Sequence, residues 1–333
     1  MVVKPNWVMH RNGGMWGTEC LITQPSLIRE VVELLLASGV GRVEVGDAPV
    51  QGCEFSEVVR GGDLAAWAKE LAARDGRFAG LHDYRRTRSR LTGGVLVQAE
   101  DQISLSDFVL FDLGPDSLLE PVSSPKGGFR VTQYDPRKMA ATHGPGRHQY
   151  LVARAVLEAD VVLNLPKLKT HRKAGLTNAL KNLVGVNGNK EFLPHHRVGG
   201  SAAGGDCYPG SSLVKVLHER LLDAQNLARS HAIRRALGIP VRLLSAAGRA
   251  LVDTLGVEGA WSGNDTVWRM CLDLNRIVLY GRPDGTMADR VQRRILTISD
   301  AIVAGQGDGP LMPEPFPLGV LLAGDNPAAV DLV

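Results

Sequence analysis

Short apolar runs and helical patterns alternate along the chain. Short strands are expected at 2–4 and 42–45, and the apolar run at 161–163 has the length of a buried strand. From residue 27 to residue 35 apolar positions recur at helical spacing, and Gly39 ends this pattern. A strand, a helix and a second strand in this order predict parallel pairing through a right-handed crossover. We therefore expect an α/β fold with mostly parallel sheets, flanking helices and βαβ units.

The same patterns predict most of the remaining elements. Helices are expected at about 54–60, 63–74, 149–158 and 174–185, and strands near 108–112, 129–133, 160–164, 294–303 and 318–323. A largely helical insertion is expected over 211–280, with helices at about 212–236, 240–255 and 264–280.

These elements suggest how the chain is organised. Residues 1–210 form an α/β domain, 211–280 a helical segment, and 281–333 a returning α/β segment that packs on the first domain. Glycines recur through 187–210, which predicts a long loop that could close as a lid. The chain ends within an apolar segment, whereas natural termini are usually polar and loose, so we expect a further C-terminal tail.

The composition narrows the classes of partner and location but does not indicate an activity. Hydrophobic residues make up 44% and charged residues 22% of the chain, and the net charge is +3. This small excess gives no reason to expect nucleic acid or an anionic membrane as a partner. No apolar run has the length of a membrane span, and no signal peptide is recognisable, so we expect a cytoplasmic protein. The four cysteines are far apart, so no iron–sulfur or zinc-ribbon motif is present.

One stretch concentrates positive charge directly after a predicted buried strand. Its basic residues have almost no compensating acid, and they are Lys167, Lys169, His171, Arg172, Lys173 and Lys181. In open α/β sheets ligands bind at the carboxyl ends of the strands, where we expect the loop with the first three of these residues to lie. The stretch therefore suggests a site for a carboxylate, a phosphate or a sugar acid.

The helix expected at 174–185 has one polar face, formed by Thr177, Asn178, Lys181 and Asn182. This face is either ordinary solvated surface or part of the binding site. Thr and Asn are poor helix formers, which favours the second interpretation. We therefore predict that these residues and Lys167 bind substrate.

Three residues are candidates for catalysis. An imidazole among cations has a depressed pKa, so His171 would be a neutral proton acceptor near pH 7. Lys169 could be depressed likewise and act as a base or a nucleophile. Asp47 ends a predicted strand and would orient the histidine or bind a cation. An inert buried histidine is the alternative for His171.

Further polar residues fall at predicted strand ends. Lys4, Asn6 and Gln51 are expected near Asp47 and are counted as substrate-binding. A Gly-Asp-x-Pro element recurs at 46–49, 307–310 and 324–327, which adds Asp308 to this group. In each copy the aspartate could instead cap a following helix, most plainly at Asp325.

A metal is left open as a cofactor. A divalent ion could be held by His171, by His195 or His196, and by an aspartate. Adjacent residues of a strand face opposite ways, so at most one of the two neighbouring histidines would point into a site.

Several segments together resemble the DUF362 family, in the order 4–7, 23–25, 45–49, 164–171, 180–183, 307–310 and 329–331. The resemblance implies a largely uncharacterised α/β protein over nearly the whole chain. Some members carry a ferredoxin-like module with iron–sulfur cysteines, and this chain lacks such a cysteine run. The order of lysines and histidines over 167–196 is also similar to nickel-pincer lactate racemases, in which lysine and histidines hold a nickel cofactor.

We therefore expect an enzyme that acts on a small anionic or polyhydroxylated metabolite by lysine and histidine acid–base chemistry, with or without a metal. Two alternatives stay open. One is an iron–sulfur-linked redox protein, and the other is a non-catalytic binder of acidic ligands. Association into a homo-oligomer is also left open.

Overall fold

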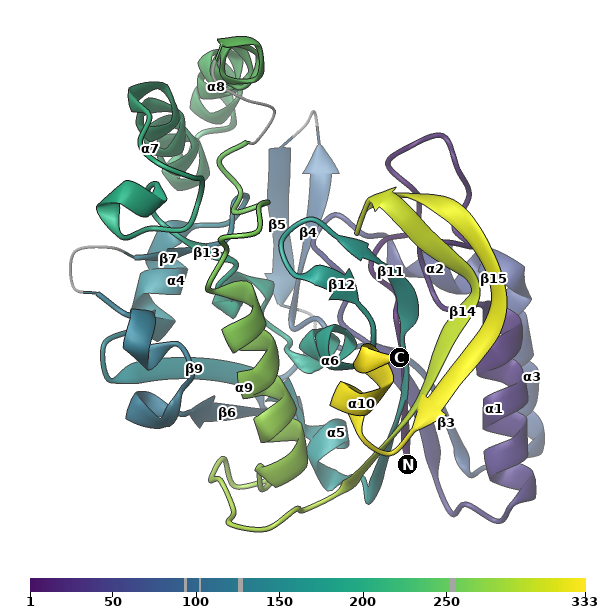
Figure 1. The fold of residues 1–333 in the computed structure, drawn as a ribbon. Helices are drawn as coiled ribbons and strands as arrows, with labels where there is room; N and C mark the ends of the chain where they lie inside the picture. Colours follow the sequence, from purple (N-terminus) through teal and green to yellow (C-terminus); the bar gives the residue numbers. More distant parts are fainter. Residues whose placement is uncertain (93–94, 102, 125–127, 252–255) are drawn as a thin grey trace.

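The protein was analysed as a computed structural model that describes residues 1–92, 95–101, 103–124, 128–251 and 256–333. Its centre is a mostly parallel sheet with the strand order β12-β11-β14-β10-β1-β2-β3 and with β15 paired to β14 (Figure 1). The strands of this sheet are β1 (Val2–Pro5), β2 (Val43–Asp47), β3 (Phe78–Asp83), β10 (Val161–Leu165), β11 (Lys167–His171), β12 (Gly175–Thr177), β14 (Arg294–Asp308) and β15 (Met312–Gly324). Only the β11–β12 and β14–β15 pairs in it are antiparallel.

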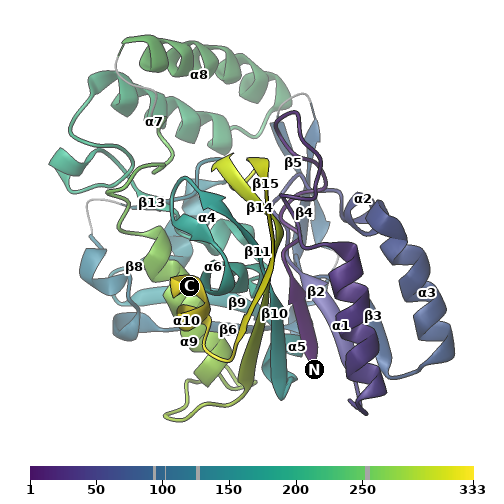
Figure 2. The same ribbon diagram turned by 45° about the vertical axis from the view of Figure 1, so that its right-hand side comes forward.

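Helices cover both faces of this sheet. The helices are α1 (Pro25–Ala37), α2 (Phe55–Arg60), α3 (Leu64–Arg74), α4 (Pro136–Thr142), α5 (Arg154–Glu158), α6 (Ala179–Asn182), α7 (Leu213–Leu227), α8 (His231–Leu251), α9 (Val267–Tyr280) and α10 (Pro327–Leu332). Figure 2 views the sheet close to its edge, with α1 and α3 on one side and α9 and α10 on the other. Neighbouring strand residues accordingly divide between two cores: Val162 belongs to the α9 side and Leu163 to the α1 side.

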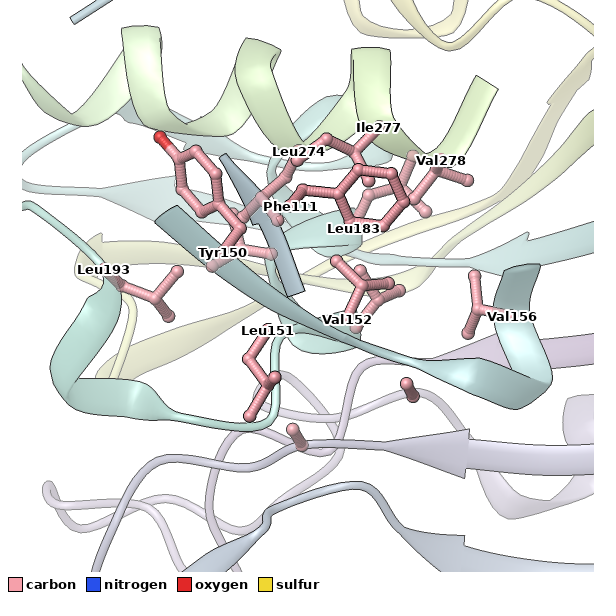
Figure 3. Close-up of a cluster of buried hydrophobic side chains, with 14 of the residues drawn as sticks. Phe111, Tyr150, Leu151, Val152, Val156, Leu183, Leu193, Leu274, Ile277 and Val278 are labelled. Carbon is pink, nitrogen blue, oxygen red and sulfur yellow. The ribbon is translucent and has the colours of Figure 1, made fainter. Parts of the chain in front are cut away.

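The core on the α9 side joins the central sheet to a smaller one. That sheet contains β6 (Phe108–Asp112), β9 (Arg147–Ala153) and β8 (His143–Gly144). Figure 3 shows Leu274, Ile277 and Val278 of α9 facing side chains of β6 and β9, among them Phe111 and Val152. All of these are buried, so α9 is held by its apolar stripe.

Two short pairings and a helical pair complete the structure. The pairings are β4 (Thr87–Thr92) with β5 (Val95–Asp101), and β7 (Phe129–Arg130) with β13 (His196–Arg197). Helices α7 and α8 stack together at one end of the molecule (Figure 2). Within the described part of the chain, no helix is both long enough and apolar enough to cross a membrane.

β10 and β11 behave as one long strand interrupted at Pro166. Both are parallel to β14, with Val161 opposite Arg294 and Lys167 opposite Asp300. The register shifts after Lys167, so Lys169 lies opposite Gly305. The backbone N–H of Asp300 donates to the carbonyl of Pro166 across the junction. This register places the basic stretch beside β14.

The predicted α/β class with a mostly parallel sheet is confirmed. The expected helices at 54–60 and 63–74 and the strands at 108–112 and 160–164 correspond to α2, α3, β6 and β10. The helical insertion is present as α7, α8 and α9, but its first break lies near Ala228 and Pro240 is inside α8. The end of the helix expected at 240–255 lies outside the described residues.

Two predicted helices are wrong. Residues 149–153 belong to β9, so only 154–158 form a helix, because the apolar run Tyr150–Val152 pairs with β6. Residues 174–185 form β12, the short α6 and a 3-10 turn. Thr177 and Asn178, which a helix would place on the polar face opposite Ala179 and Leu183, are as buried as those two apolar residues. The helix prediction failed there because Gly175–Thr177 pairs with β11 as a strand, and because Asn178 has a buried polar partner in Ser299.

Two of the aspartates considered as helix caps, Asp308 and Asp325, do not cap helices. Asp308 ends β14 at its tight connection to β15, so the segment 307–310 leads into a hairpin and no helix follows. Helix α10 is capped by the Asn326 side chain, which accepts from the backbone N–H groups of Ala328 and Ala329. Asp325 does not have this role.

A substitution at Asp273 of α9 tests how the core between α9 and the smaller sheet is held together. Its buried carboxylate accepts hydrogen bonds from the Leu118 N–H, the Ser117 hydroxyl and the Tyr150 hydroxyl. Asp273→Ala should lower the free energy of unfolding by about 3 kcal/mol, because two buried hydroxyls and the Leu118 N–H lose their acceptor and Arg276 loses its ion pair. Urea unfolding would measure the change. Asp289→Ala, at an exposed position, is the control and should leave stability unchanged.

Candidate functional site

β11 directs its basic side chains to one face. Lys167, Lys169 and His171 are buried, whereas Leu168 and Thr170 between them are partly exposed. The expectation that these basic residues lie in a loop after a strand is wrong, because β11 continues the line of β10 beside β14. The alternation by two residues is the strand period, and it is visible in the sequence.

Two of the buried lysines are neutralised by aspartates. The Lys4 Nζ lies 2.8 Å from Asp47 Oδ1, and the Lys167 Nζ lies 2.7 Å from Asp300 Oδ2. Asp47 also accepts from the backbone N–H groups of Trp7 and Ala48. These contacts give Asp47 a structural role in the pair. Asp300 was missed from the sequence because only the register of β11 on β14 brings it to Lys167.

Lys169 has no carboxylate partner in the described structure. Its Nζ donates to Asn6 Oδ1 at 2.8 Å and to the carbonyl oxygen of Leu21. Burial, together with the charges of Lys167 and Lys181, holds the pKa of Lys169 well below its ordinary value. It is therefore the buried lysine that the surroundings most strongly favour as a neutral amine.

Three asparagines tie the strand ends to α6. Asn6 Nδ2 donates to Asn182 Oδ1 at 2.9 Å, and Asn182 Nδ2 donates to Asn164 Oδ1 at 2.8 Å. Asn164 in turn donates to the carbonyl of Ala179 at the start of α6. The predicted substrate-binding residues Asn6 and Asn182 therefore hold the site together.

Two further lysines face this region without an acid. Across the described residues, neither Lys181 nor Lys190 has a hydrogen bond or an ion pair to its ammonium. Lys190 is buried, and its pKa falls from 10.5 to about 7, chiefly because of burial, while Asp47 acts in the opposite direction. Lys181 is half-buried, and its charge lowers the pKa of Lys169, His171 and His195. The sequence analysis did not single out Lys190, whose burial depends on the tertiary structure.

His171 and His195 have opposite proton positions. Nδ1 of His171 accepts from the backbone N–H groups of Lys173 and Ala174, both at 3.1 Å, so its proton is on Nε2. Nδ1 of His195 lies 2.7 Å from the carbonyl oxygen of Leu193 and must donate, so its Nε2 is an unprotonated acceptor.

The pKa of both imidazoles lies well below the ordinary value. Burial is the largest cause, and the charges of Lys181 and Lys173 lower both further. The charge of His195 is itself among the effects that lower the pKa of His171, so the two imidazoles are electrostatically coupled. The cluster thus offers one N–H donor, one basic nitrogen and an unpaired ammonium.

His196 is also buried, and its pKa is lowered by burial and then by the charges of Lys173 and His195. It lies beside Gly259, where an added Cβ would come within 2.7 Å of its own Cβ, and its Nδ1 has no hydrogen-bond partner. Among the described residues, no group of three or more His, Cys, Asp or Glu side chains is placed to hold a metal ion. The arrangement therefore gives no support to His171, His195 and His196 as a three-histidine metal site.

The remaining predicted residues fall in different places. Thr177 lies opposite Lys169 across the β11–β12 pair, and its buried hydroxyl has no partner. Asn178 accepts a hydrogen bond from the Ser299 hydroxyl. Gln51 holds the first strand of the β4–β5 pair through Thr87 and Ser89. Asp308 is exposed and far along β14, with Arg172 4.0 Å away.

A family model described as a domain of unknown function, DUF362, matches residues 121–333. The chain belongs to the DUF362 family. The matched range holds β11, α6, Lys190 and His195, whereas Lys4, Asn6 and Asp47 precede it. The resemblance expected over nearly the whole chain is thus shown for its last two thirds.

Other comparisons with this DUF362 protein add little. No curated protein matches the chain, so the similarity to lactate racemases gains no support. A crystal structure of a Thermotoga maritima protein aligns with 99% of the chain at a TM-score of 0.39 and 9% identity. The chain spans 50% of that protein.

The buried ammonium of Lys190 predicts a pH-dependent stability. Its folded pKa of about 7 lies below the ordinary 10.5, so between these values the unfolded chain binds more protons and stability rises with pH. Lys190→Met removes this charge and should stabilise the protein by several kcal/mol below pH 7, with the gain fading toward pH 10. Urea unfolding across this range would measure it. A pH-independent effect, like that expected for the exposed control Lys69→Met, would contradict the burial argument.

Proposed function

We propose that this protein is an enzyme that removes a proton from the carbon next to a carboxylate or carbonyl group of a small anionic metabolite. The observation that carries the proposal is the pair of neutral imidazoles with opposite proton positions beside the unpaired Lys181 ammonium. A reaction of this class needs a base, a donor to the developing oxyanion, and a positive charge for the substrate anion.

Each requirement has a candidate residue. The bare Nε2 of His195 takes the proton from carbon. The Nε2–H of His171 donates to the oxygen on which negative charge develops, and a neutral imidazole can serve in this way without giving up its proton. Lys181 binds the substrate carboxylate. The hydroxyl of Thr177, which is buried without a partner, supplies a further hydrogen bond.

Substrate charge also tunes the base. The cations Lys173 and Lys181 depress the pKa of His195 in the free protein. A bound carboxylate offsets these charges and raises that pKa toward its ordinary value. His195 therefore becomes a stronger base when an anion is bound, which restricts proton abstraction to the occupied site.

The alternatives have less support. For Cys53, Cys207 and Cys271, burial raises the pKa of the thiol, which disfavours the thiolate that a cluster ligand requires. A non-catalytic binder of anions would need only the lysine cations. The opposite proton positions of His171 and His195 would then have no function.

Hydrogen exchange from solvent tests the proposal without knowledge of the substrate. The protein is incubated in D₂O with small 2-hydroxy, 2-oxo and sugar acids, and mass spectrometry finds the compound that gains deuterium on carbon. His195→Gln should slow this exchange by about 10²–10⁴-fold because the base is lost. His171→Gln should slow it by about 10²–10³-fold.

The control variant Lys69→Met changes an exposed lysine of α3 and should exchange like the wild type. Exchange that persists in His195→Gln would rule out this base. Thermal stabilisation by an acid that never gains deuterium would favour the non-catalytic binder.

The pH profile gives a separate prediction. Because the pKa of His195 is well below 6.5, exchange at subsaturating substrate should stay constant from pH 8 through 6.5 and fall only at lower pH. Lys173 is the largest charge effect on His195, so Lys173→Met should move the fall toward 6.5. An unchanged profile in that variant would show that Lys173 does not act on the base.

A further inference from the structure

A pocket of about 570 Å³ lies apart from the lysine and histidine cluster. It is bounded by the β4 strand, the start of α4, the second half of α7 and the first half of α8. Of the residues predicted from the sequence to bind substrate, only Gln51 lines it. Its volume is within the range of sites that enclose a small molecule.

The lining of this pocket carries an excess of positive charge. Its basic residues include Arg137, Lys138, Arg229, Arg234, Arg235 and Arg242, and its acidic residues are Asp135 and Glu191. Both acids are already paired: Asp135 lies 2.6 Å from Arg137, and Glu191 lies 2.9 Å from Lys138. Among the described lining residues, no carboxylate therefore remains to neutralise Arg235 and Arg242.

Helix α8 departs in part from the ordinary orientation of a surface helix: Val241 is buried and Arg235 and Arg242 are exposed, but several apolar side chains are exposed as well. Arg234, Gly238 and Arg242 follow one another at four-residue spacing along the face that lines the pocket. On the opposite side, Ile233, Ile239 and Leu243 are 56%, 56% and 66% exposed. A helix on a protein surface ordinarily buries its apolar stripe and turns its charges to solvent.

The seam between α7 and α8 shows how this orientation is held. Gln225 of α7 donates to the carbonyl of Arg234, and Ser245 of α8 is hydrogen-bonded to His218. A Cβ at Gly238 would lie 2.9 Å from the Gln225 amide nitrogen, so the two helices approach closely there. Polar contacts of this kind keep the arginine face turned toward the pocket.

We propose that this pocket is a binding site for a small organic phosphate with two or more negative charges. Guanidinium groups form paired, charge-assisted hydrogen bonds with phosphate oxygens, and several of them converge here. Leu222 and Val241 add an apolar wall for the organic part of the ligand. The pocket volume and its lining from four separate elements favour a small molecule over a polymer or a bilayer.

This site is distinct from the proposed proton-transfer centre, although one turn adjoins both. In the 3-10 turn Lys190–Phe192, Glu191 lines the pocket, whereas the Lys190 charge acts on the Lys4–Asp47 region. The test therefore measures binding and not turnover, so the two proposals can fail separately.

Calorimetric titration with ADP and with inorganic pyrophosphate, at constant ionic strength, tests the site. Both should bind the wild type, and the double variant Arg235→Gln/Arg242→Gln should weaken binding by about a hundredfold, as expected for two lost charge-assisted contacts. Arg235→Lys/Arg242→Lys keeps the charge but loses the paired geometry, so it should bind with intermediate affinity. Arg290→Ala, at an exposed position outside the pocket, should bind like the wild type.

Thermal unfolding without ligand checks that each variant is folded. The proposal is overturned if neither probe binds, if the double glutamine variant binds as well as the wild type, or if citrate binds more tightly than pyrophosphate. Tighter binding to vesicles of mixed phosphatidylcholine and phosphatidylserine, or to polyuridylate, than to ADP would also overturn it. Tighter binding to the vesicles would indicate that the exposed apolar side of α8 contacts a membrane surface.

Discussion

The cost of placing several ammonium groups inside one protein is the constraint on which this structure depends. Lys4 and Lys167 are fully buried, and each meets an aspartate within 2.8 Å. Buried charges are tolerated only when they are paired or hydrogen-bonded, so the strands that supply these partners cannot shift without a large penalty. The register of β11 on β14 and the approach of β1 to β2 both follow from this requirement.

The lysines that lack an acid stand out against this background. Lys169 is held by two oxygen atoms, and Lys181 and Lys190 have neither an acid nor a hydrogen bond within the described part of the chain. The resulting field lowers the pKa of neighbouring lysines and histidines and attracts anions. The Lys4–Asp47 pair is closely packed against Gly185. A Cβ at this position would lie 1.9 Å from Asp47 Oδ1 and 2.6 Å from the Lys4 Nζ, so a larger residue would disturb the pair. Burial and this field together link the fold to the proposed chemistry, because both lower the pKa of His171 and His195 and favour the neutral imidazoles.

Much of the site can be predicted from the sequence, and some of it cannot. Lys169, His171 and Lys181 stand out by their charge at the end of a predicted strand, and they do come together. Asp300 and Lys190 were missed because each becomes important only through a neighbour distant in sequence. His195 and His196 are equal candidates in the sequence, and in the structure it is the charge of His195 that acts on His171. The arginine-lined pocket was also missed, because its basic residues come mainly from α4 and α8, which only the tertiary structure brings together.

The sequence by itself determined the α/β class, the parallel core strands and the concentration of unbalanced positive charge over 163–182. Those features depend on local periodicity and composition, which are present in any short window of the chain. Tertiary structure decided which lysines are neutralised, which nitrogen of each histidine carries the proton, and where a pocket opens. These depend on strand register and on backbone groups such as the Leu193 carbonyl. A side chain's charge state is set by the partners that folding brings to it, and no local pattern contains that information.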